Sequence, residues 1–260
     1  MKIGLIGGGT VATFLAKSIN RDHKLPGNSV EAVLLRKPDV AGEWECAYGV
    51  RAFTDVEAFL AAGIDIVVEA ATVEAVRDYA ELVISRGKDL VVISVGALVD
   101  QELYDRLSGL CRKLGTRIHL PSGAIGGLDV IQSAVILGQL DEVSLTTRKP
   151  PVSLLGRQVD AEEIVFTGTA TEAISQFPKN INVAIVLSLA GLGCSQTRVT
   201  IVADPKATKN IHCIEAVGSF GKMSIRLEND PMPDNPKTSY LAALSVLSTL
   251  KKQTARISIG

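Results

Sequence analysis

The sequence has no excess of positive charge, few histidines and no closely paired cysteines, features on which several classes of protein depend. Its 260 residues carry 27 Lys and Arg against 28 Asp and Glu, a balance that gives no reason to expect nucleic acid or an anionic membrane as a partner. There are three histidines, so few side chains are candidates for proton transfer near neutral pH. The four cysteines lack C-x-x-C spacing, which argues against a zinc site or a disulfide framework; they are Cys46, Cys111, Cys194 and Cys213.

Long apolar segments are missing too. The longest, residues 183–192, is about ten residues long and is interrupted by Ser188, which makes it too short to span a bilayer. The N-terminal residues show no separate charged and apolar blocks leading to a cleavage site, as a secretory signal would. With 47% apolar residues the chain can still bury a substantial core. We therefore expect a globular, cytoplasmic protein with no metal site.

What the chain does contain begins at its N-terminus, where a short apolar run leads through three glycines into residues with helical apolar spacing. Gly7, Gly9 and Ala12 fit the pattern G-x-G-x-x-G/A. Glycines let the backbone approach a pyrophosphate, and the first turn of the helix offers N–H groups at its positive end. A glycine-rich turn without a ligand is the alternative. The preceding strand and following helix favour a dinucleotide, with Gly7, Gly9, Thr10 and Val11 as contacts.

The second predicted strand, residues 29–35, ends in a basic turn formed by Arg36 and Lys37. In a nicotinamide-binding fold an acidic residue at this tip accepts a hydrogen bond from the ribose of NAD, whereas a basic one accommodates the 2′-phosphate of NADP. A solvated basic turn without a ligand would look the same. We expect the cofactor to be NAD or NADP, with NADP accepted through Arg36.

From this turn to Leu120 strands alternate with amphipathic helices, which predicts right-handed crossovers and a parallel sheet. Thr54 and Thr72 are placed to cap two of the helices. Because ligands bind at the carboxyl ends of such strands, Ala70, Ala71 and Ala97 are expected to border the same crevice as the glycine turn.

After Leu120 the pattern changes to a second glycine-rich turn, a helix, and several segments of alternating or β-branched residues that predict an antiparallel sheet. Thr169 and Glu172 are spaced to cap a helix, another helix covers residues 182–192, and the last one starts at Asn235-Pro236. The last helix presents four leucines inward, Leu241, Leu244, Leu247 and Leu250.

The predicted fold class is α/β, with an N-terminal Rossmann domain at residues 1–121 built on a doubly wound parallel sheet. Residues 236–260 are expected to pack back on that domain. Residues 122–235 form an α+β domain with a largely antiparallel sheet, which carries substrate and catalytic groups and whose open face can pair with a second subunit.

The three histidines differ in their surroundings. His23 stands among charged residues in a surface loop, and His119 alternates with apolar residues at a strand end, where a structural role is favoured over ligand contact. His212 follows a polar loop at the start of a strand in the second domain. Of the three it is the best candidate acid or base, with a buried or edge histidine as the alternative.

Several motifs of the second half occur in one order: PSGAIGGLD at 121–129, FPKNINVA at 177–184, VTIVADP at 199–205, NIH at 210–212 and NPKTS at 235–239. Together they resemble L-aspartate dehydrogenase over nearly the whole chain. The resemblance implies that His212 is catalytic and that Ala124 and Asn182 contact the nicotinamide cofactor. From the open sheet of the second domain we expect a homodimer or higher oligomer. The resemblance also implies reversible oxidation of L-aspartate to iminosuccinate, which water converts to oxaloacetate and ammonia, and a possible supply of the imine to NAD synthesis.

A dicarboxylate substrate requires cations, and the sequence does not rank those available: Arg148, Lys149, Lys179, Lys209 and Lys237. Asn180 and Asn182 lie at a helix entrance, where one can contact ligand while the other caps. The turn from Ser122 can lay backbone N–H groups against a ligand or can serve only for packing. The substrate-binding candidates are Ser122, Lys179, Asn180, Lys209, Lys237 and Thr238.

Two alternatives remain at this point. A two-domain oxidoreductase of another small amino or oxo acid, similar to homoserine dehydrogenase or dihydrodipicolinate reductase, would share the first domain but not the motifs of the second. A non-catalytic NADP-binding sensor would keep the fold without turnover, but the presence of His212 and of both asparagines argues against it.

Overall fold

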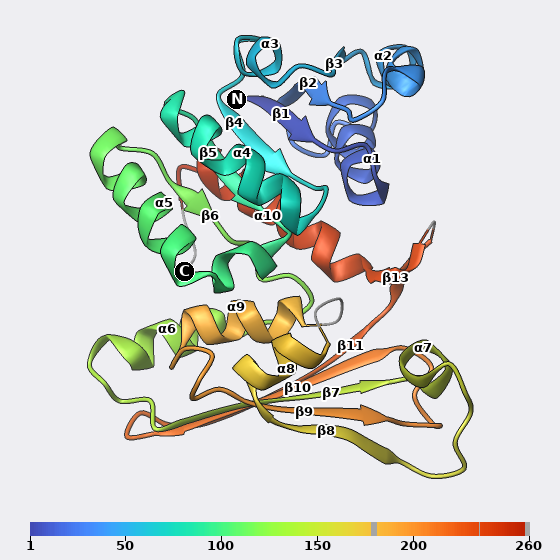
Figure 1. The fold of residues 1–260 in the computed structure, drawn as a ribbon, viewed down its shortest axis with the longest axis vertical. Helices are drawn as coiled ribbons and strands as arrows, with labels where there is room; N and C mark the ends of the chain where they lie inside the picture. Colours follow the sequence, from blue (N-terminus) through green and yellow to red (C-terminus); the bar gives the residue numbers. More distant parts are fainter. Residues whose placement is uncertain (178–180, 234, 258–260) are drawn as a thin grey trace. The chain divides into compact units, whose positions relative to one another are not determined.

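The computed structural model describes residues 1–177, 181–233 and 235–257, and these cluster into two compact units (Figure 1). The first unit comprises Met1–Pro121 together with the described residues from Ala243 onward. The second unit comprises Ser122–Ala242. Among the described residues no helix combines the length and the apolar character needed to cross a membrane.

The first unit is built on a six-stranded sheet whose paired strands are all parallel, in the order β3-β2-β1-β4-β5-β6. Its strands are β1 (Lys2–Ile6), β2 (Ser29–Leu34), β3 (Arg51–Phe53), β4 (Ile66–Glu69), β5 (Asp89–Val92) and β6 (Ile118–His119). Order 3-2-1-4-5-6 is that of a doubly wound Rossmann sheet, so this part of the predicted fold class is confirmed. The order reverses at β1, which places the ligand edge at the carboxyl ends of β1 and its neighbours.

The helices of this unit follow from local signals in the sequence. They are α1 (Thr10–Ala16), continued by a π-helical turn (Lys17–Arg21), α2 (Ala41–Tyr48), α3 (Val56–Leu60), α4 (Val73–Ser85) and α5 (Gln101–Leu114), with 3₁₀ turns at Pro38–Val40 and Val95–Val99. Thr72 caps α4 as predicted, since its Oγ1 accepts from the Ala75 N–H at 3.2 Å. The cap of α3 is Asp55 rather than the predicted Thr54, because the Asp55 carboxylate accepts from the Ala58 N–H at 2.8 Å.

The second unit contains a five-stranded sheet in the order β11-β10-β7-β9-β8. Its strands are β7 (Glu142–Lys149), β8 (Glu163–Thr169), β9 (Arg198–Ala203), β10 (Asn210–Gly218) and β11 (Gly221–Asn229), and its helices are α6 (Leu128–Ile136), α7 (Pro151–Leu155), α8 (Ala170–Gln176) and α9 (Asn182–Ala190). Only the β7–β9 pair is parallel among these, which confirms the largely antiparallel sheet. Thr169 and Glu172 form the predicted capping box at the start of α8.

Alternation along the strands gives this sheet one buried and one open face. In β7 the side chains of Val143, Leu145 and Thr147 are buried, while those between them are partly exposed. Figure 1 shows α6, α8 and α9 on one side of the sheet, and the buried side chains belong to that side. The opposite face is hollowed, with a cavity of about 720 Å³ lined mainly by polar strand residues.

The prediction that the last helix starts at Asn235-Pro236 is wrong. Asn235–Ser239 forms strand β13, paired with β12 (Pro231–Met232), and α10 (Tyr240–Thr254) begins after it. An amide hydrogen bond from Asn235 Nδ2 to Thr238 Oγ1, at 3.1 Å, supports this extended segment instead of a helical first turn. The apolar face of α10 also differs from the expected one: Val246 and Leu250 are buried in the core of the first unit, whereas Leu244 is 38% exposed.

Candidate active site

The glycine turn of the first unit follows β1 and is shaped by close backbone contacts. Gly7 has φ +101° and donates its N–H to the Leu34 oxygen at 2.9 Å. A Cβ at this position would lie 2.8 Å from both the Ala70 oxygen and the Ala71 Cβ, so only glycine fits. The turn therefore brings the ends of β1, β2 and β4 together, as the sequence pattern requires.

Gly9 leaves room where a phosphate would sit. It is the N-cap of α1, no side chain caps this helix, and a Cβ built on it meets nothing within 4 Å. Thr10 and Val11 are half-buried in the first turn of the helix. Open space beside a glycine at the positive end of a helix suits an anion, so the residues present fit the pyrophosphate of a dinucleotide.

The other cofactor residues predicted in this unit lie in different environments. Arg36 is exposed just beyond β2, and Ala71 is exposed and Ala70 half-buried beyond β4. Ala97 is completely buried within the 3₁₀ turn Val95–Val99, so its side chain is not accessible to a ligand in this structure.

Glu69 is a residue of this edge that the sequence prediction missed. It is 1% exposed, and its carboxylate accepts from the backbone N–H groups of Ala71 (2.8 Å), Ser94 (2.9 Å) and Ile93 (3.2 Å) and from the Ser94 hydroxyl (2.8 Å). Burial raises the pKa of Glu69, and the four hydrogen bonds oppose this rise. Glu69 thereby fixes the two loops that follow β4 and β5. The signal for Glu69 in the sequence was a carboxylate at the end of an apolar strand.

In the second unit His212 lies on the buried face of β10. It is 5% exposed, and its Nδ1 is 3.0 Å from Oγ1 of Thr147, its register partner in β7. Burial, followed by the positive charge of Lys149, lowers the pKa of His212 to about 4. The imidazole is therefore neutral at neutral pH. A Thr147 oxygen that accepts from Nδ1–H leaves the Nε2 lone pair available to take up a proton.

The structure separates the cations that the sequence could not rank. Arg148 pairs with Glu162 at 2.7 Å and with Asp204 at 3.4 Å, and Lys209 pairs with Asp230 at 2.7 Å. Lys149 is half-buried at the end of β7, and burial lowers its pKa. Lys179, Asn180 and the side chain of Lys237 lie outside the described residues.

A second glycine-rich turn precedes α6 and is fastened to the sheet near His212. Ala124 is 6% exposed, and its carbonyl oxygen accepts from Asn229 Nδ2 at 3.0 Å. Asn229 is itself 5% exposed and pairs in the ladder with Asn210, two residues before His212. Sequence reasoning missed Asn229 because its partner is 105 residues away.

The remaining candidates of the second unit lie in the turn before α6, at the start of α9 and in β13. Ser122 is half-buried in the same turn as Ala124, and Asn182 is exposed as the first residue of α9. Thr238 is half-buried in β13, where its hydroxyl accepts from Asn235. Within the described part of the chain no three His, Cys, Asp or Glu side chains come together to hold a metal ion.

Comparison with known proteins identifies the family. Residues 129–253 match the family model described as aspartate dehydrogenase, C-terminal, and residues 7–121 match the NAD binding domain of homoserine dehydrogenase. L-Aspartate dehydrogenase of Methanospirillum hungatei is 45% identical over 260 residues, covering 100% of this chain and 99% of the relative. That of Archaeoglobus fulgidus is 44% identical over 251 residues, covering 96% and 97%. The chain belongs to the L-aspartate dehydrogenase family.

A solved structure of the L-aspartate dehydrogenase family agrees with this assignment. The crystal structure of aspartate dehydrogenase from Thermotoga maritima is 30% identical in sequence, has a TM-score of 0.81, and covers 100% of this chain and 99% of that chain. The resemblance recognised from the motifs is thus confirmed. The match to a homoserine dehydrogenase domain ends at residue 121, so it reflects the nucleotide-binding half and does not favour that alternative.

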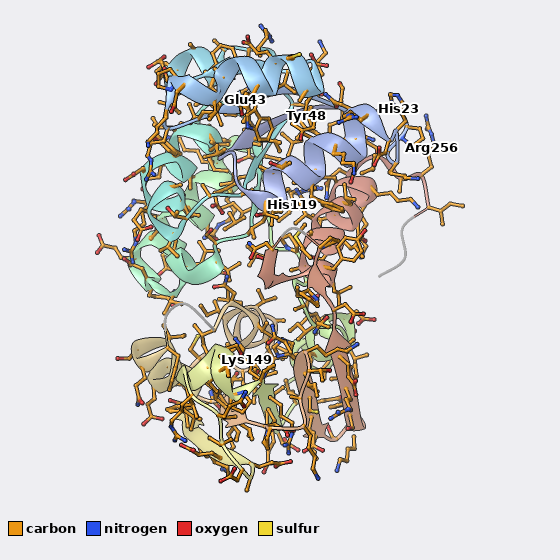
Figure 2. The ribbon with its side chains drawn as sticks, turned by 90° about the vertical axis from the view of Figure 1, so that its right-hand side faces the viewer. His23, Glu43, Tyr48, His119, Lys149 and Arg256 are labelled. Atoms are coloured by element: carbon orange, nitrogen blue, oxygen red, sulfur yellow. The ribbon has the colours of Figure 1, made fainter. Side chains whose placement is uncertain are left out.

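The other two histidines of this aspartate dehydrogenase family member are less suited than His212 to act as acid or base, because of their contacts and surroundings. His119 Nε2 is 3.5 Å from Asp89 Oδ2, and its Nδ1 is 3.4 Å from Gln253 Nε2, so the ring joins β5, β6 and α10 (labelled in Figure 2). His23 is exposed in a loop with φ +50°. These observations support the preference for His212.

Proposed function

We propose that this protein is an NAD(P)-dependent L-aspartate dehydrogenase, in which His212 is the acid and base. The observation that carries the proposal is a buried, neutral imidazole in a chain whose full length is similar to L-aspartate dehydrogenases. The overall reaction converts L-aspartate and the oxidised cofactor to iminosuccinate, the reduced cofactor and a proton, and water then gives oxaloacetate and ammonia.

In this proposal the first unit holds the cofactor. Gly7 lets the turn approach the pyrophosphate, backbone N–H groups at Gly9 and Thr10 bind it, Val11 and Ala71 border it, and Arg36 meets the 2′-phosphate of NADP. The bound nicotinamide supplies the hydride acceptor for the C–H bond at Cα of aspartate. Ala124 and Asn182 of the second unit are the proposed nicotinamide contacts of that unit.

His212 moves the proton. Aspartate binds with its α-amino group as an ammonium, and the nitrogen lone pair must be released before a C=N bond can form. Neutral His212 takes that proton at Nε2, while Thr147 holds Nδ1. In the reverse direction the imidazolium returns the proton to nitrogen.

The test is substrate oxidation by the purified protein with NAD⁺ and with NADP⁺, using aspartate, glutamate, alanine and homoserine. Aspartate should be turned over far faster than the other three. His212→Gln should lower kcat by about 10²- to 10⁴-fold, as loss of a general base does, with cofactor binding retained. Faster turnover of homoserine, or tight cofactor binding without turnover of any substrate, would contradict the proposal.

We also propose that two copies associate through the open face of the second unit's sheet. Two large apolar side chains there are exposed, Ile164 at 68% and Val217 at 40%. Covering such a face with an equivalent one is a common solution for an uncovered sheet. Light scattering should give a dimer mass for the natural chain and a monomer mass for Ile164→Asp. A monomer at micromolar concentration would reject this part of the proposal.

A further inference from the structure

The end of β7 brings a lysine close to the proposed base. In the β7–β10 ladder Thr147 faces His212, and Lys149 lies two residues beyond Thr147, so all three belong to the same face of the sheet. Figure 2 labels Lys149 among the side chains of the second unit. This placement puts the Lys149 charge near the imidazole, where it lowers the pKa of His212.

The backbone of Lys149 is firmly held. Its carbonyl oxygen accepts from the Asp204 N–H at 2.9 Å, and it pairs with Ala203 in the neighbouring strand β9. Such a backbone fixes the starting point of the side chain and the face of the sheet from which it leaves, which a ligand-positioning group requires. Arg148, its neighbour in sequence, belongs to the other face and is engaged with Glu162 and Asp204.

The positive charge of Lys149 has a cost that an anion beside it would reduce. Partial burial of the side chain penalises its ammonium form, and the same charge makes His212 a weaker base. An anionic group placed beside Lys149 stabilises the ammonium and restores the basicity of the imidazole. A substrate carboxylate has that charge and is present only when there is a proton to move.

We propose that Lys149 binds a carboxylate of the substrate beside His212 and thereby makes the site selective for dicarboxylates. This inference rests on the proposed aspartate dehydrogenase function and extends it to the residue that recognises the substrate. Lys149 is then both a binding residue and the group through which substrate occupancy tunes the base.

The test compares Lys149→Gln and Lys149→Arg with Lys222→Gln, a matched control in which the same change is made at an exposed lysine of β11. Binding is measured with succinate, a dicarboxylate that has no amino group to oxidise, and turnover is measured with aspartate. Lys149→Gln should raise the Kd for succinate and the KM for aspartate about 10- to 100-fold, the loss expected for a charge-assisted hydrogen bond. The KM for NAD⁺ should stay unchanged, and the arginine variant should retain part of the affinity.

A second readout separates this role from a structural one. Among the charged groups described, Lys149 is the one that lowers the pKa of His212, and Thr147 is the hydrogen-bond partner of the ring. Lys149→Gln should therefore move the acidic limb of the pH profile of kcat/KM to higher pH, whereas Lys149→Arg and Lys222→Gln should leave it in place.

The outcomes distinguish the two proposals. If the natural protein does not oxidise aspartate, the proposed function fails, whatever the variants do. If it does, and Lys149→Gln keeps the succinate Kd, the aspartate KM and the pH limb, the inference about Lys149 is overturned alone. Equal losses in Lys149→Gln and Lys222→Gln would also overturn it, because the effect would not be local to the base.

Discussion

The low pKa of His212 predicts that the second unit loses stability in mild acid. In the unfolded chain the imidazole titrates at its ordinary value of 6.5, whereas in the fold it titrates at about 4. Above pH 6.5 the ring is neutral in both states, so its titration does not lower the unfolding free energy. As the pH falls below 6.5, His212 binds a proton in the unfolded chain but not in the folded unit. The unfolding free energy therefore declines until the pH is below 4. At about 1.4 kcal/mol per pKa unit, the total loss is about 3 kcal/mol.

The assay is urea unfolding of the natural protein and of His212→Gln between pH 7.5 and pH 4, followed by circular dichroism. The difference in unfolding free energy between the two proteins should change by about 3 kcal/mol over this range in favour of the glutamine variant at low pH. All other ionisable side chains are the same in the two proteins, so their contributions cancel in this difference. Trp44, the one tryptophan of the chain, lies in the first unit, so its fluorescence provides a control transition that the substitution should leave alone.

A difference that stays constant to within about 0.5 kcal/mol from pH 7.5 to pH 4 would refute this reasoning, because it would mean that His212 titrates alike in both states. The imidazole can also be followed directly by NMR, with the glutamine variant identifying its resonance. A midpoint near 6.5 in the folded protein would have the same meaning. It would also remove the basis for assigning a neutral buried base to the second unit.

Further predictions concern the two turns. Gly7→Ala should destabilise the first unit by about 1–3 kcal/mol in urea unfolding, because alanine is strained at φ +101° and its Cβ meets a backbone oxygen 2.8 Å away. Gly9→Ala should leave unfolding unchanged and weaken NAD⁺ binding at least about tenfold in calorimetry, because its Cβ enters the open space proposed for phosphate. Arg36→Glu should raise the KM for NADP⁺ at least about tenfold relative to that for NAD⁺. Asn229→Ala should cost about 1–3 kcal/mol in the second unit, because it leaves the buried Ala124 oxygen without its donor.

The sequence predicts the first unit well because its signals are local. Strand, glycine turn and helix lie within residues 2–16, and the cap of α4 joins residues three apart in the chain. Parallel order then follows from the alternation of strands and helices, for which the crossover rule allows few topologies. His212 was also selected from a short local pattern, a family motif at a strand start, and its catalytic role stays a prediction.

The prediction fails where pairing between neighbours in space outweighs local propensity. Asn235-Pro236 has the pattern of a helix start, yet this segment pairs with β12, and the helix begins at Tyr240. Helix α2 and strand β3 were not predicted from the sequence either. Trp44 is the one buried side chain of α2, so the helix has no apolar stripe at helical spacing, and the three residues of β3 form a strand because β2 offers them an edge.

The residues that sequence reasoning missed have a common physical role. The loop after β4 and the turn around Ala124 consist largely of alanine and glycine, which leave space for a ligand but have little side chain with which to pack. Such loops need an anchor from the rigid sheet, and a buried polar side chain provides it through directional hydrogen bonds to their backbone. Glu69 does this in the first unit and Asn229 in the second, with partners up to 25 and 105 residues away. Because a small-residue loop gives no sign of which distant strand holds it, its anchor emerges only when the strands are placed side by side.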